Sequence, residues 1–190
     1  SGNCANWISA NRLLLNRQVE AAVIENDNRT ILNEGLAYDR CSVGIVTNLD
    51  LDDIAPECSI TEPEQIYNVM RTQVDVVLPS GAAVLNADDD AVVKMAELSD
   101  GEVILFSRYG LNDATQNHLK NGGRALFTEN NQIILAQGNE RQTLIDLSNV
   151  PLLQSSSKTN ALENVLAAVG ATWALNSPKD IIVAGLQTFN

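Results

Sequence analysis

The chain has 190 residues, and its 24 acidic and 12 basic side chains give a formal net charge of −12 at pH 7. That length suits one domain of ordinary size, and a hydrophobic content of 45% argues against disorder. Aromatic residues make up only 4%, so the core must be built mainly from aliphatic side chains. An acidic surface repels phosphate backbones and anionic membranes, so neither nucleic acid nor a membrane is expected as a partner.

The sequence also predicts a soluble protein of the reducing cytoplasm. No apolar run approaches the ~18–20 residues that cross a bilayer, and no basic segment followed by an apolar stretch begins the chain. Cys4, Cys41 and Cys58 form no C-x-x-C pair, and an odd number cannot close a complete disulfide framework. Cys41 opens an apolar run, so we expect it to be a small buried hydrophobe.

The first part of the chain alternates short apolar runs with helical patterns. Strands are expected at 20–25, 43–48, 82–86 and 103–107, and helices at 62–78 and 90–98. Nearly continuous β-branched runs are typical of strands covered on both faces of a parallel sheet. Thr61 is the expected cap of the first helix, with Pro63 where its missing N–H does no harm. This alternation predicts βαβ units, which place loops at the carboxyl ends of the strands.

The next part departs from that alternation. Three strands are expected, at 124–129, 132–137 and 140–147. The turn formers Asn130-Asn131 and Gly138-Asn139 join them, which predicts a small antiparallel meander at about 124–147.

A helical tail is expected over 159–190, with an Ala-rich helix at 159–175 and a second helix at 178–186. The whole chain, 1–190, is therefore predicted to form a single α/β domain. Its mostly parallel sheet would be flanked by helices and extended by the antiparallel meander.

Polar residues follow the predicted strands, at the edge where open α/β sheets bind ligands. The carboxylates expected along this edge are Glu25, Asp27, Asp50, Asp52, Asp53, Asp88, Asp89 and Asp90. Packed carboxylates repel one another unless a cation lies between them, so a magnesium site is one interpretation. The other is that these residues cap the following helices and face solvent.

Other catalytic motifs are missing from the sequence. No G-x-x-x-x-G-K-[ST] motif occurs, because none of the four lysines follows a glycine, and Gly122-Gly123 precedes a strand rather than a helix. His118 is the only histidine and has no Cys or His at metal-ligand spacing, so we expect a solvated helix residue. No G-x-S-x-G motif is present.

Seven segments carry a further signal: 1–4, 19–25, 31–41, 43–48, 84–89, 122–125 and 163–168. Over nearly its whole length, the chain resembles the Mur-ligase-like region of the cyanophycin synthetase family, where these segments occur in the same order. The resemblance implies a Mur-ligase central-domain fold and an ATP-dependent ligase. In that family ATP phosphorylates a carboxylate, Mg²⁺ bridges the phosphates, and an amino group displaces phosphate to form an amide. The carboxylates are aspartate side chains of a poly-aspartate backbone, to which arginine is added.

The resemblance also implies roles for individual residues. Metal contacts are implied for Glu25, Asp52 and Asp53, and nucleotide contacts for Asn48, Asn86, Asp88 and Asp89. The match is incomplete, because 26–30 replaces the family's T-A-R-G-G and Met70 stands where the family has a lysine. An Asp-His pair of the family reads Asp52-Asp53 here, which keeps an oxygen ligand for a hard cation.

The family's phosphate-binding loop lies upstream of the segment resembling 1–4, and its C-terminal ligase domain follows the G-L-x-T-F pattern seen at 185–189. We therefore expect a partial central ligase domain that is not catalytic alone, with ATP and Mg²⁺ as the implied cofactors. Its partner would be the remainder of a longer ligase polypeptide or a second copy of the chain. The alternative is a non-catalytic α/β binding or oligomerisation module derived from a ligase domain.

Overall fold

The computed structural model describes residues 7–53, 56, 60–155 and 160–189, and its centre is a six-stranded sheet in the order β1-β2-β3-β4-β5-β6. The strands are β1 (Cys41–Val46), β2 (Val77–Asn86), β3 (Glu102–Ser107), β4 (Arg124–Glu129), β5 (Gln132–Gln137) and β6 (Glu140–Asp146). Neighbours from β1 to β4 pair in parallel, whereas β5 and β6 pair antiparallel. The predicted α/β class, mostly parallel with an antiparallel meander, is confirmed.

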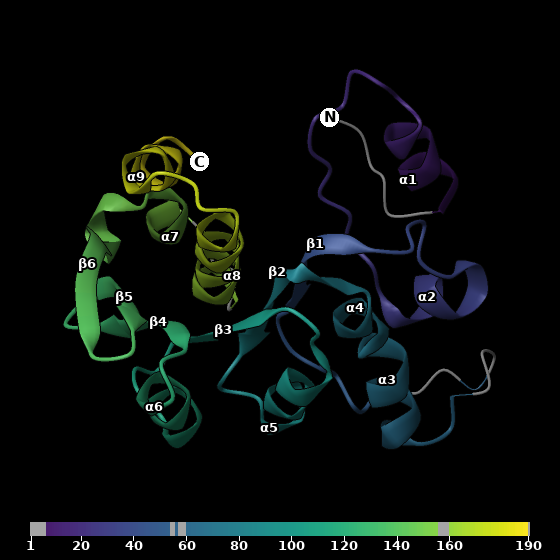
Figure 1. Ribbon diagram of the computed structural model, residues 1–190, viewed down its shortest axis with the longest axis horizontal. Helices are drawn as coiled ribbons and strands as arrows, with labels where there is room; N and C mark the ends of the chain where they lie inside the picture. Colours follow the sequence, from purple (N-terminus) through teal and green to yellow (C-terminus); the bar gives the residue numbers. More distant parts are fainter. Residues whose placement is uncertain (1–6, 54–55, 57–59, 156–159, 190) are drawn as a thin grey trace.

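Helices cover both faces of the sheet (Figure 1). They are α1 (Trp7–Leu14), α2 (Asn28–Glu34), α3 (Pro63–Met70), α4 (Thr72–Asp75), α5 (Asp90–Val93), α6 (Asp113–Lys120), α7 (Pro151–Ser155), α8 (Ala161–Ala174) and α9 (Lys179–Thr188), with 3₁₀ turns at Lys94–Leu98 and Leu147–Asn149. Figure 1 shows α7, α8 and α9 on one side of the sheet and α3 to α6 on the other. Among the described residues, no helix combines the length and hydropathy needed to cross a bilayer.

Two apolar clusters, one on each face, form the core. Along β2, Val84 packs with α8 and α9, whereas Leu85 packs with the residues of α4 to α6. The fully buried rings of Phe106 and Phe127 likewise belong to opposite faces. Successive strand residues point to opposite faces, so a strand covered on both sides must be apolar throughout. This explains why the strand runs were recognisable in the sequence.

The predicted helix over 62–78 is wrong at both ends. The backbone N–H groups of Thr61 and Glu62 both donate to Gln65 Oε1, at 2.7 and 3.0 Å, so the capping residue is Glu62 rather than Thr61. At the other end α4 stops at Asp75, and Val77 already belongs to β2, where it is fully buried. Val77 fitted the helical spacing because burial in a strand selects the same kind of side chain.

The predicted strand at 20–25 is absent. The segment is irregular, and Val23 is 91% exposed. Among the described strands, β1 pairs only with β2, so residues 20–25 have no ladder of hydrogen bonds. An apolar run without a neighbouring strand cannot satisfy its backbone groups as a strand.

Two smaller expectations also change. His118 is half-buried rather than solvated, because its Nε2 lies 2.9 Å from the carbonyl oxygen of Val103 and its ring packs on Gly123. Cys41 is half-buried, and burial raises the pKa of its thiol. Residues 1–4, Cys58 and the expected helix start at 159 lie outside the described residues.

Candidate functional site

The carboxyl ends of β1, β2 and β3 open onto one edge of the sheet, because these strands are adjacent and parallel. The loops that follow them, at 47–53, 87–89 and 108–112, make up what we call the carboxyl edge. Ligands of open α/β sheets bind in the crevice outside such strand ends. The carboxyl edge is therefore the candidate site.

Asp88 joins the loops after β2 and β3. Its Oδ1 accepts a hydrogen bond from Ser107 Oγ at 2.6 Å, and its Oδ2 accepts one from the Arg108 backbone N–H at 2.7 Å. Asn112 Nδ2 donates to the same Oδ1 at 3.4 Å. Asn86 turns its Oδ1 to the Asp88 N–H at 2.9 Å, so the predicted pair Asn86 and Asp88 fixes this loop.

Asp89 joins the loop after β1 to the helix after β2. Its Oδ2 accepts a hydrogen bond from the Leu49 N–H at 3.0 Å, and its Oδ1 accepts from Ala91 N–H at 2.9 Å, which caps α5. This contact brings Asn48, an exposed residue beside Leu49, to the same edge as Asp89.

The loop after β1 also contacts α2. Asp53 accepts a hydrogen bond from Asn28 Nδ2 at 3.1 Å and forms a half-exposed ion pair with Arg29 at 3.0 Å. Asp27 caps α2 by accepting from the Thr30 N–H at 2.6 Å. Hydrogen bonds thus connect α2, which follows Glu25 in the chain, with the loops that carry Asn48 and Asp88.

The predicted metal residues differ in what they do. Asp53 is held by Asn28 and Arg29, whereas Glu25 and Asp52 are exposed to solvent. Among the residues that the structure describes, no group of three or more His, Cys, Asp and Glu is placed to hold a metal ion. Asp27 and Asp89 cap the following helices, as the second interpretation of the acidic cluster expects, whereas Asp53 and Asp88 connect loops, which neither interpretation included.

An ion pair between a half-buried arginine and a buried glutamate ties the carboxyl edge to α8. Arg108 Nη1 lies 3.2 Å from Glu163 Oε1, and Glu163, in the first turn of α8, is only 7% exposed. The guanidinium also lies over the Tyr109 ring, 4.5 Å from its centroid, and donates to the Tyr109 hydroxyl. That hydrogen bond, and with less weight the Glu163 carboxylate, raises the pKa of Arg108 against the opposing effect of desolvation.

The sequence analysis assigns no role at the site to Arg108, Tyr109 or Glu163. One signal was available, since Arg108 directly follows the strand predicted at 103–107, at the same edge of the sheet as Asn48 and the Asp88 loop. Glu163 lies in the Ala-rich helix predicted at 159–175, and the spacing of the apolar residues in that helix does not show that Glu163 faces inward.

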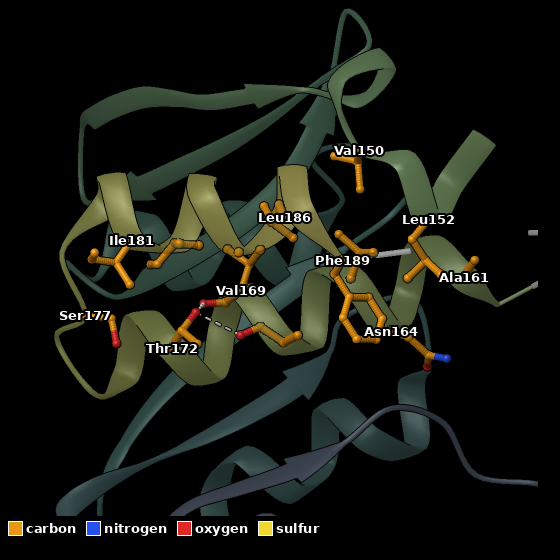
Figure 2. Close-up of a pocket in the computed structure, with 14 residues that line it drawn as sticks. Val150, Leu152, Ala161, Asn164, Val169, Thr172, Ser177, Ile181, Leu186 and Phe189 are labelled. Carbon is orange, nitrogen blue, oxygen red and sulfur yellow. Dashed lines mark hydrogen bonds between the residues drawn. The ribbon is translucent and has the colours of Figure 1, made fainter. Parts of the chain in front are cut away.

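An apolar cavity of about 560 Å³ lies between α7, α8 and α9 (Figure 2). Its walls include Val169, Leu186 and Phe189. The hydroxyl of Thr172 lines it too, but donates to the helix carbonyls of Ala168 and Val169 at 2.9 and 3.0 Å. This cavity offers a polar substrate few groups to bind.

A second cavity, of about 300 Å³, lies beside the amino ends of the strands, around Arg124. Arg124 is 8% exposed; its Nε donates to Glu102 Oε1 at 2.5 Å and its Nη1 donates to the Trp173 carbonyl at 3.2 Å. The Glu102 carboxylate neutralises the guanidinium, so this arrangement serves to hold the fold.

The fold matches that of Mur ligases. A crystal structure of MurF from Acinetobacter baumannii superposes with a TM-score of 0.66 at 17% identity, over 100% of this chain and 39% of that one. A structure of UDP-N-acetylmuramoylalanyl-D-glutamyl-2,6-diaminopimelate–D-alanyl-D-alanyl ligase from the same organism gives a TM-score of 0.62 at 16% identity. The protein therefore contains a Mur-ligase-like α/β domain.

The sequence comparisons are more specific. The chain is 35% identical over 181 residues to cyanophycin synthetase of Crocosphaera subtropica and 31% over 189 residues to that of Nostoc sp.. It is 27% identical over 148 residues to a UDP-N-acetylmuramate–L-alanine ligase of Clostridium novyi. No known family model matches. The chain is thus a homologue of cyanophycin synthetases, and it spans 21% of the length of those two relatives.

Proposed function

We propose that this chain is the central part of an ATP-dependent ligase that forms amide bonds, and that its carboxyl edge binds the nucleotide. The observation that carries the proposal is the hydrogen-bonded junction of the loops after β1, β2 and β3 through Asp88 and Asp89. Homology to cyanophycin synthetases and Mur ligases supports the ligase class. The exposed Asn48 would contact the nucleotide, while the buried Asn86 together with Asp88 and Asp89 holds the loops in place.

A carboxylate is a poor electrophile until ATP converts one oxygen into a phosphate leaving group, and the developing charge then needs a cation. The resemblance to cyanophycin synthetases assigns that carboxylate to aspartate side chains of a poly-aspartate backbone, and the attacking amine to arginine. The complete polypeptide would carry out this reaction, and the chain alone would not.

The residues present suit Mg²⁺ that arrives with the nucleotide. Mg²⁺ is usually held by one or two carboxylates together with substrate phosphates and water, rather than by a preformed protein cage. The exposed carboxylates of Glu25 and Asp52 can each offer an oxygen ligand to Mg²⁺ that the phosphates of the nucleotide also hold. Mg²⁺ would neutralise the phosphates, which is otherwise difficult on so acidic a chain.

Calorimetric titration with Mg²⁺ and ATP tests this proposal. Saturable binding that Glu25→Ala abolishes supports it. Glu20→Ala is the matched control, because it removes an exposed glutamate from the same irregular segment. If no binding heat is measured at millimolar nucleotide, the proposed nucleotide site is contradicted and the non-catalytic binding module is favoured.

One observation favours a role in association as well. Among the described strands, β1 has a free edge, and Trp7, Ile8, Leu15 and Val23 near the N-terminus are exposed. An open strand edge and exposed apolar side chains are normally covered. The remainder of a longer ligase polypeptide or a second copy of the chain would cover them. Light scattering that shows a strict monomer at high concentration counts against the second copy.

A further inference from the structure

The geometry points to Tyr109 as the side chain that stacks on the base of a bound nucleotide. Tyr109 is 73% exposed, which makes it the most exposed aromatic side chain among the described residues. It lies two residues beyond the end of β3, within the carboxyl edge. The inference rests on the proposed nucleotide-binding function and assigns the base-binding part of that same site.

Hydrogen bonds to the backbone and a stacked guanidinium hold the exposed Tyr109 ring in place. Its own backbone N–H donates to Ser107 Oγ at 3.2 Å, and the preceding N–H donates to Asp88 Oδ2 at 2.7 Å. The Arg108 guanidinium covers one face of the ring at 4.5 Å, and Glu163 fixes that guanidinium at 3.2 Å. Because Arg108 covers one face, the exposure of the ring belongs to its edge and its other face.

A fixed aromatic ring with one face open suits a flat π-system. Base–aromatic stacking is favourable for every nucleobase, and a stacked guanidinium behind the ring adds a cation–π contribution. A ring that is already ordered also loses little conformational entropy on binding.

The position of Tyr109 along the edge fits the order of groups in a nucleoside triphosphate. Adjacent strands lie ~4.8 Å apart, so the loops after β1 and β3 are separated by roughly 10 Å. The carboxylates proposed for Mg²⁺ lie at and before the β1 loop, and Asn86 lies at the end of β2. A base on Tyr109 therefore places the ribose near β2 and the phosphates near β1.

The test compares Mg²⁺-ATP with Mg²⁺-tripolyphosphate, which lacks the base, in calorimetric titrations of the full chain. In Tyr109→Ala, ATP affinity is expected to fall roughly 5- to 100-fold while tripolyphosphate affinity stays unchanged. Tyr109→Trp keeps a stacking surface and should bind ATP within about threefold of the original. Phe189→Ala is the matched control, since Phe189 is an exposed aromatic that lines the apolar cavity instead.

Each remaining outcome overturns the inference. If Tyr109→Ala binds ATP as tightly as the original chain, the base lies elsewhere, and the proposed function stands. If ATP and tripolyphosphate weaken equally, Tyr109 supports the loop rather than the base. If the original chain binds no ATP, the inference and the proposed function fail together.

Discussion

Two arginines fasten the two ends of α8 to the sheet. At the first turn of the helix, Arg108 pairs with Glu163 and stacks on Tyr109. At the last turn, Arg124 pairs with Glu102 and lies over the Trp173 ring, 4.9 Å from its centroid. Both arrangements therefore combine a guanidinium, a carboxylate and an aromatic ring.

The two arrangements differ in which member is exposed. Around Arg124 the guanidinium is the buried member, and the half-buried Trp173 ring belongs to the helix it fastens. Around Arg108 the carboxylate of Glu163 is buried, while the Tyr109 ring is left in solvent at the carboxyl edge. The same three groups therefore bury the aromatic ring partly at one end of α8 and leave it exposed at the carboxyl edge at the other.

The largest effect is expected from Arg108→Ala. The Glu163 side chain is only 10% exposed, so the variant leaves a buried carboxylate without its cation. Breaking such a pair should lower the free energy of unfolding by about 3 kcal/mol, measured by urea denaturation. Adding Glu163→Gln should recover part of the loss, because the amide needs no cation. A double variant as unstable as the single one would show that packing of the Arg108 side chain, not charge, carries the effect.

Glu102→Ala tests the other end of α8 and should cost less, about 2 kcal/mol. It leaves the buried Arg124 without its carboxylate, but the Trp173 carbonyl and ring remain as partners. Glu102→Gln should cost roughly half as much, because it keeps one hydrogen bond. A loss larger than that of Arg108→Ala, measured by the same denaturation, would reverse the ranking of the two ends.

The sheet was predictable from the sequence because burial on both faces leaves a continuous apolar run at β1, β2, β3 and β4. The same logic failed at 20–25, where the run is apolar but no neighbouring strand pairs with it. It also misplaced Val77, whose burial fits a helix or a strand equally well from spacing alone. Pairing and burial depend on contacts distant in sequence, which a local pattern does not contain.

The acidic edge was predictable for a similar reason. Residues that follow parallel strands meet at one edge, so Asn48, Asn86 and Asp88 could be grouped without coordinates. The sequence could not show how the oxygens of Asp88 are used, because their donors Ser107 and Arg108 lie 19 and 20 residues away. Nor could it show that Glu163 faces inward to meet Arg108.

The smallest effect is expected at a third arrangement of the same kind, on the meander. Arg141 Nη1 lies 3.8 Å from Glu129 Oε1, and Arg141 Cζ lies 5.7 Å from the centroid of the Phe127 ring.

Burial is what distinguishes this third pair, since the two charged side chains are 50% and 48% exposed. Exposed ion pairs gain little over their separate hydration and are screened by salt, so Arg141→Ala should change the free energy of unfolding by less than about 0.5 kcal/mol. Urea denaturation at low and high salt measures both the size of the change and its screening. If Arg141→Ala cost as much as Glu102→Ala, the grouping of arginine, carboxylate and ring would itself be stabilising, and burial would not explain the ranking. If Arg141→Ala instead changes the free energy of unfolding by less than about 0.5 kcal/mol, burial is the property that distinguishes the two ion pairs of α8 from the pair on the meander.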